Sequence, residues 1–187
     1  MMGIEEVVSI GDSLFLFEIS ELAHKYLTPE TWSQLDGAVQ LYTISLERVQ
    51  GTRPITPYEL CVLADKVAGF MLANPEAVLC YYCDFLNEIP SMRANRPAIS
   101  RQAYRSLLFS LLFDRYTSSH YVESYTQSII TIDGDEDYYI HIVAQRDLSP
   151  YMAIIARDFQ IGYGKKANDF SSALFVCLGR ASLIFFF

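Results

Sequence analysis

The run Ala77–Cys83 constrains the fold of this chain more than any other segment. Its sequence, AVLCYYC, contains no charged side chain, and it lies between Pro75 and Asp84. An apolar run of this length without polar alternation is typical of a strand that is buried on both faces. We therefore expect other elements on both sides of a sheet. The composition, with 51% hydrophobic and 19% charged residues, supplies enough apolar surface for this and excludes a disordered chain.

Three segments show the spacing of amphipathic helices: 56–73, 100–116 and 149–162. In the first of them, Thr56 and Glu59 stand in a capping-box pattern, with Pro57 at the first helical position. Asn74, which is followed by a proline, ends this helix. Apolar residues recur at steps of three and four in all three segments, which predicts a buried face on each helix.

Residues that favour strands concentrate in three further segments: 38–49, 122–133 and 138–146. The connection at 134–136 predicts that the last two form an antiparallel hairpin. The first 36 residues are less regular. Apolar residues at steps of three and four predict a helix over 19–27, and Pro29 suits the start of a short helical turn.

This order of elements predicts the fold class. A single strand–helix–strand unit can be parallel, whereas the two strands of a hairpin are antiparallel. We therefore expect an α+β fold with a mixed, mostly antiparallel sheet and helices packed on it. The pattern places one domain at 1–170, in keeping with the usual domain size of roughly 100–200 residues.

Residues 171–187 form an apolar tail that we interpret as an appendage to the domain. A final buried strand and a peptide that binds a partner or a membrane surface are the alternatives. The apolar part, 173–187, is shorter than the roughly 20 residues that span a bilayer, and Arg180 interrupts it, so we expect no membrane span. The first ten residues contain no Lys or Arg, which argues against a secretory signal. We expect a cytoplasmic protein with reduced cysteines.

Positive charge is concentrated in the segment 91–105. This segment contains Arg93, Arg96, Arg101 and Arg105 and no acidic residue. This segment carries a charge of +4. Because the whole chain carries −8, the remaining residues carry −12. Arginine can hold a phosphate or carboxylate through two parallel hydrogen bonds, and a helix start favours an anion. The segment is therefore a candidate anion site; the alternative is a solvated loop whose arginines pair with surface carboxylates.

Cys80 and Cys83 form a C-x-x-C motif inside the expected buried strand. Redox pairs of this kind begin a helix, whereas an odd separation within a strand puts the two side chains on opposite faces. A zinc site would need two further ligands from Cys61, His120 and His141, which are scattered in the sequence. We therefore expect buried, unreactive cysteines and no metal.

The tip of the expected hairpin begins like a calcium loop, with Asp133, Asp135 and Asp137. The sixth position is Tyr138, where glycine is needed, and the twelfth is Ala144, where a bidentate glutamate belongs. We therefore interpret it as an acidic tip, which discourages edge-to-edge association.

No catalytic constellation stands out in the sequence. A G-x-S-x-G elbow and a glycine-rich phosphate loop are both absent. Asp84, which follows the buried strand, is the one carboxylate that we retain as a candidate general base.

The net negative charge of the chain limits which partners it can bind. Nucleic acid and a nuclease toxin are disfavoured, because phosphate contacts need a positive field. No cofactor is indicated. A protein partner or a small anionic ligand fits the arginine segment, and a homo-oligomer is compatible with the composition.

The stretch 77–116 resembles a known family. It consists of an apolar strand that ends in Tyr81 to Asp84, a connection that carries arginines, and a helix that ends in Leu112 to Tyr116. This pattern is similar to that of a group of small uncharacterised proteins from Bacteroidota, known as a domain of unknown function. The resemblance implies a cytoplasmic bacterial protein and brings no activity with it.

Two functions remain open from the sequence. The first is a non-enzymatic binding or interaction protein that engages an anionic ligand or partner through the segment from Arg93 to Arg105. The alternative is an enzyme that acts on a phosphorylated or nucleotide-like small molecule, in which these arginines hold the anion and Asp84 is the general base.

Overall fold

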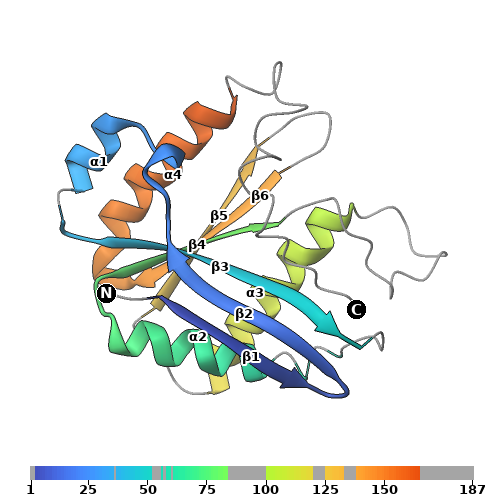
Figure 1. Cartoon of the computed structure of the whole chain (residues 1–187). Coiled ribbons are helices and arrows are strands. Elements are labelled where there is room, and N and C mark those ends of the chain that lie inside the picture. Colours follow the sequence, from blue (N-terminus) through green and yellow to red (C-terminus); the bar gives the residue numbers. More distant parts are fainter. Residues whose placement is uncertain are drawn as a thin grey trace.

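A six-stranded mixed sheet in the order β1-β2-β3-β4-β6-β5 forms the centre of the computed structural model (Figure 1). The structure describes residues 3–35, 37–51, 56, 58–59, 61–83, 100–119, 125–132 and 138–164. The strands are β1 (Ile4–Ile10), β2 (Ser13–Glu21), β3 (Gln40–Gln50), β4 (Ala77–Cys83), β5 (Tyr125–Ile132) and β6 (Tyr138–Gln145). Only the pair β3–β4 is parallel among the described residues, and the other neighbours are antiparallel.

Helices cover both faces of this sheet. The helices are α1 (Pro29–Leu35), α2 (Cys61–Ala73), α3 (Arg101–Ser119) and α4 (Ser149–Gly164). Helices α2 and α3 lie on one face, and α1 and α4 lie on the other (Figure 1). The expected α+β class, with a mixed and mostly antiparallel sheet, is therefore confirmed.

Strand β4 is buried on both faces, as its apolar sequence predicts. Leu79 and Tyr81 face the cluster beneath α2 and α3, while Val78 and Cys80 face the cluster beneath α1 and α4. Residues on one strand alternate between faces, so this central strand joins the two cores.

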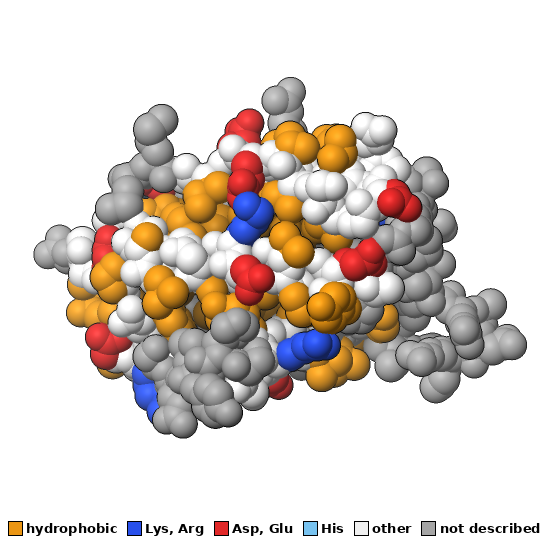
Figure 2. Space-filling view, turned by 90° about the horizontal axis from the view of Figure 1, so that it is seen from below, with side chains coloured by type: hydrophobic (Ala, Val, Ile, Leu, Met, Phe, Trp, Pro, Cys, Tyr) orange, Lys and Arg blue, Asp and Glu red, His pale blue; other side chains and the backbone are white. Residues whose placement is uncertain are grey.

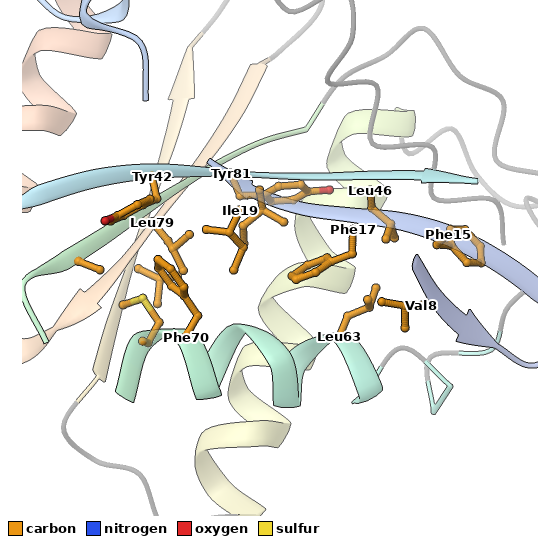
Figure 3. Packing of buried hydrophobic residues seen from close by; sticks show 14 of the residues in the cluster. Val8, Phe15, Phe17, Ile19, Tyr42, Leu46, Leu63, Phe70, Leu79 and Tyr81 are labelled. Atoms are coloured by element: carbon orange, nitrogen blue, oxygen red, sulfur yellow. The ribbon is translucent and has the colours of Figure 1, made fainter. Parts of the chain in front are cut away.

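The core on the α2 and α3 side is rich in aromatic rings (Figure 3). Side chains of β2 and β3 point down from the sheet toward α2, where Leu63 and Phe70 rise to meet them. The rings of Tyr42 and Phe70 meet edge to face, with centroids 4.9 Å apart. This geometry is favourable for aromatic pairs.

The N-terminal hairpin corrects one prediction. The helix expected over 19–27 is wrong, because β2 continues to Glu21 and only His24–Tyr26 form a short 3-10 turn. Phe15, Phe17 and Ile19 alternate with less buried residues, so the true period in this stretch is two. The strand β1, paired with β2 across a turn at Gly11, was also not predicted.

The end of α2 agrees with its capping pattern, but its start does not: α2 begins at Cys61, five residues after the predicted N-cap Thr56. Thr56 and Glu59 form the predicted capping box: the Thr56 backbone N–H donates to Glu59 Oε2 at 2.8 Å, and the Glu59 N–H donates to Thr56 Oγ1 at 3.3 Å. At the other end of α2, the Asn74 side chain donates to the Phe70 carbonyl at 2.8 Å. Helix α4 runs to Gly164, slightly beyond the expected end.

Several predicted features lie outside the described residues. They include the hairpin tip at 133–137, His120 and the tail at 171–187. Among the described residues, no helix is long and apolar enough to cross a membrane.

Candidate functional site

The start of α3 carries the described part of the arginine segment. Arg101 is the first residue of α3, and the Ala103 N–H donates to Ser100 Oγ at 3.1 Å, as expected for an N-cap. Arg93 and Arg96 lie outside the described residues, as does the side chain of Arg101. The structure therefore places two of the four arginines on one helix, one turn apart.

Arg105 lies inside the fold. Its side chain is only 1% exposed, and Gln102 and Ser106 on the same helix are also buried. A charged group is rarely buried unless polar neighbours satisfy it, and Arg105 does take part in an interaction. For this residue, the solvated-loop interpretation does not hold.

The buried polar face of α3 continues along the helix as an apolar one. Gln102, Arg105 and Ser106 lie at the spacing of one helical face, and the next residues at that spacing, Phe109 and Phe113, pack on the core. The spacing was visible in the sequence. The sequence alone does not mark the polar residues of this face as buried, because such residues usually face solvent.

His141 on β6 connects this polar face to the sheet. Its ring is fully buried; Nε2 lies 2.8 Å from Ser106 Oγ, and Nδ1 lies 2.9 Å from Gln127 Nε2 on β5. Because the amide nitrogen of Gln127 donates, Nδ1 accepts, and the ring proton sits on Nε2 and points to Ser106. Burial lowers the pKa of His141 to about 4, so the imidazole is neutral at neutral pH.

Aromatic rings border this polar cluster. The Phe109 ring stacks on Tyr81 with centroids 4.5 Å apart, and the same Phe109 ring lies 4.8 Å from the imidazole of His141. Both Tyr81 and Phe109 also line an apolar cavity between α2, α3 and the sheet. The rings of Tyr81 and Phe109 therefore border both the polar cluster and the cavity.

The other candidates have little chemistry in the described residues. Cys80 is buried, and burial raises the pKa of its thiol to about 12, so it is protonated at neutral pH and is a poor nucleophile. The side chain of Cys83 and all of Asp84 lie outside the described residues. Within the described ranges, no three His, Cys, Asp or Glu side chains gather as a metal site would require.

His141 has both ring nitrogens engaged and no access to solvent, so it cannot exchange a proton with a ligand at neutral pH. The enzymatic hypothesis depends on Asp84 and stays a prediction.

No protein-family model matches the chain, and no curated protein is detectably similar to it. The resemblance to the Bacteroidota family also stays a prediction.

Proposed function

We propose that this chain is a binding protein that engages an anionic ligand or partner through the segment 93–105. The segment supports this by its charge, because it contains four arginines and no carboxylate in a chain that is otherwise strongly acidic. An anion that approaches the protein is repelled by most of the surface charge and attracted here.

The buried position of Arg105 is the observation that carries the proposal. Its charge is held inside the fold, one helical turn from Arg101. The first N–H groups of a helix have no partner within the helix, so they add a partial positive charge at the same end. Arg105 belongs to the same end of α3, so Arg101, Arg105 and these N–H groups all bring positive charge to that end.

Titration of the whole chain with inorganic phosphate at constant ionic strength tests the proposal. Binding is followed by NMR chemical shifts, with chloride as the reference anion. The variant Arg101→Gln keeps a polar side chain of similar length and removes one charge. We expect it to weaken phosphate binding about tenfold, as for the loss of one charge-assisted contact.

The matched control is Arg115→Gln on the same helix. Arg115 is exposed near the opposite end of α3, where its guanidinium lies over the ring of Tyr58. We expect phosphate binding to be unchanged in this variant. If Arg101→Gln binds phosphate as tightly as the wild-type chain, or if both variants weaken binding equally, the proposal is wrong.

A further inference from the structure

One face of the sheet is covered along only part of its width. Among the described residues, the core beneath α1 and α4 contains no residue of β1 or β2, and Leu41 is its only residue from β3. In Figure 1 these two helices lie at one end, and the hairpin β1–β2 extends away from them. The opposite face of the same hairpin is covered, because Leu63 of α2 lies beside Val8 and Phe17 (Figure 3).

The alternation of side chains determines what this uncovered face presents. Val8 and Ile10 of β1 face the core beneath α2, so Val7 points the other way. The register extends the pattern across the strands, since Val7 lies opposite Leu16, and Leu16 lies opposite Glu47. We call this surface the open face; its side chains include Glu5, Val7, Leu14, Leu16, Glu18 and Glu47.

The centre of the open face is apolar. Val7 is 61% exposed, and its cross-strand neighbour Leu16 is half-buried. Leu14 is two residues from Leu16 on the same strand, so the three side chains are contiguous. Contiguous exposed apolar side chains that are rimmed by polar ones mark interaction surfaces.

The rim of the open face is acidic. Glu5 lies directly opposite Glu18, an arrangement of like charges that destabilises a sheet unless a cation lies near them. None of the three glutamates of this face forms an ion pair with a described residue. Arg48 is the only Lys or Arg in β1, β2 and β3, and its guanidinium lies over the Phe15 ring on the covered face. A cation from outside would therefore be attracted here.

The side of the molecule formed by α2 and α3 differs from the open face in its charge. There, acidic and basic side chains both lie between hydrophobic ones (Figure 2). Lys66 of α2 pairs with Glu6 of β1 at 2.7 Å, so this glutamate already has its cation. The unbalanced negative charge is a property of the open face.

The width of the open face suits one helix. Three strands spaced about 4.8 Å apart span about 10 Å, which is close to the diameter of a single helix. A helix placed there would continue the layer that α1 and α4 form on the same side of the sheet (Figure 1). A second copy of the open face would bring three more carboxylates to the contact, whereas a basic helix would neutralise those present.

We propose that the open face binds a basic amphipathic helix of a partner protein. The apolar stripe of that helix covers the three aliphatic side chains, and its lysines or arginines pair with the three glutamates. The open face lies on the side of the sheet opposite α3, so the inference does not depend on the proposed anion site.

The test is a titration of the whole chain with a model helix of leucine and lysine, about 14 residues or four turns long. The same helix with glutamate in place of lysine is the reference, and NMR chemical shifts report binding. We expect the lysine helix to shift the amides of β1, β2 and β3 and to bind at least tenfold more tightly than the glutamate helix. If the lysine helix does not bind, or shifts only α2 and α3, the proposal is overturned.

The double variant Glu5→Gln/Glu47→Gln removes two charges from the open face. Both side chains are exposed, so the fold is retained, and we expect the lysine helix to bind about fivefold more weakly. The matched control is Asp65→Asn/Asp114→Asn, which removes two exposed charges from α2 and α3 and gives the same net charge. Equal losses in the two double variants would mean that the lysine helix responds only to net charge, which contradicts the proposal.

The variant Val7→Thr tests the apolar contact, because it keeps the β-branched shape and replaces one methyl group with a hydroxyl. We expect the lysine helix to bind about threefold more weakly. Val62→Thr on α2 is the control, since Val62 is also exposed but lies on the other side of the sheet, and it should bind like the wild-type chain. An unchanged affinity in Val7→Thr would remove the apolar centre from the contact and refute the proposed amphipathic partner.

Analytical ultracentrifugation of the chain alone tests a second copy as the occupant. We expect the wild-type chain and the variant Val7→Lys to have the same oligomeric state. A wild-type dimer that dissociates in Val7→Lys would mean that a second copy covers the open face, and the proposal would be wrong.

Discussion

His141 shows how one titratable side chain can link pH to the stability of this fold. The native state holds its imidazole neutral, with a pKa of about 4, whereas an unfolded histidine titrates near 6.5. Between these two values the unfolded chain binds a proton that the native chain does not. Native stability from this group is therefore complete above pH 6.5 and falls as the pH drops toward 4.

The variant His141→Gln tests this dependence. Gln can replace the two hydrogen bonds but does not titrate. We expect the stability advantage of the wild-type chain over His141→Gln to shrink by up to about 3 kcal/mol between pH 7 and pH 4, measured by urea unfolding.

His24→Gln is the control for this experiment. His24 is exposed, and its ring lies against that of Trp32 with centroids 4.2 Å apart, so the stability curve of this variant should run parallel to that of the wild-type chain over the same pH range. Parallel curves for His141→Gln and the wild-type chain would show that the native fold does not lower the pKa of His141.

At the level of single residues, the sequence shows where the arginine segment lies but not which of its arginines are buried. Charge counting marks Arg105 as basic, and capping marks the start of the helix near Ser100. Whether Arg105 faces solvent depends on which stripe of α3 meets the sheet. This depends on tertiary packing. Gln102 and Ser106 lie on the same face of α3, and because both are polar, the sequence does not show that this face is buried.

At the scale of elements, one contact ties α1 to α4. Asp158 on α4 accepts a hydrogen bond from the Thr28 N–H at 2.7 Å and from the Thr28 hydroxyl at 3.0 Å. Thr28 itself caps α1, since its hydroxyl accepts from the Thr31 N–H at 3.3 Å. A carboxylate at the start of α1 is also favourable to the helix dipole.

We expect Asp158→Ala to lower the free energy of unfolding by about 1–2 kcal/mol, as for the loss of a helix cap and its hydrogen bonds. Urea unfolding at neutral pH measures this. Asp147→Ala is the control, because Asp147 is exposed on the 3-10 turn before α4, and it should change stability by less than about 0.5 kcal/mol. Equal effects in the two variants would contradict the role given to Asp158.

Two glycines should respond in opposite directions to the same substitution. Gly11 turns the β1–β2 hairpin with a φ of 56°, a conformation that other residues adopt at a cost. Gly69 lies inside α2, and an added methyl group would meet no atom within 4 Å. We expect Gly11→Ala to destabilise the fold by about 1 kcal/mol and Gly69→Ala to stabilise it by about 1 kcal/mol.

Thermal unfolding of the two alanine variants checks this pair of expectations. Changes of the same sign would contradict either the left-handed turn at Gly11 or the open helical position at Gly69.

The elements that the sequence predicted well are those with strong local signals. The apolar run predicts β4 and Asn74 predicts the end of α2, since both signals are read within a few residues. The capping box at Thr56 and Glu59 forms, but α2 begins after it, at Cys61. The stretch after residue 13 misled because Ile19, Leu22 and Tyr26 happen to share helical spacing, although Ile19 belongs to a strand and Tyr26 to a separate turn. The pairing of β2 with β3 is a long-range contact that no local sequence pattern shows.

At the scale of the whole molecule, the fold separates two environments along α3. The first turns of the helix carry buried polar groups beside a basic segment, and the later turns line an apolar cavity. Fold class follows from the order of patterns, and so could be predicted. The cavity could not, because it results from how α2 and α3 settle on the sheet and not from any one motif.

The central claim is that anions bind at the start of α3. A crystal structure of the whole chain soaked in sodium tungstate, a heavy oxyanion with a strong anomalous signal, tests it most directly. We predict an anomalous peak within hydrogen-bonding distance of Arg93, Arg96 or Arg101 at that helix end. Tungstate found only elsewhere, or held only between neighbouring molecules of the crystal, would contradict the claim.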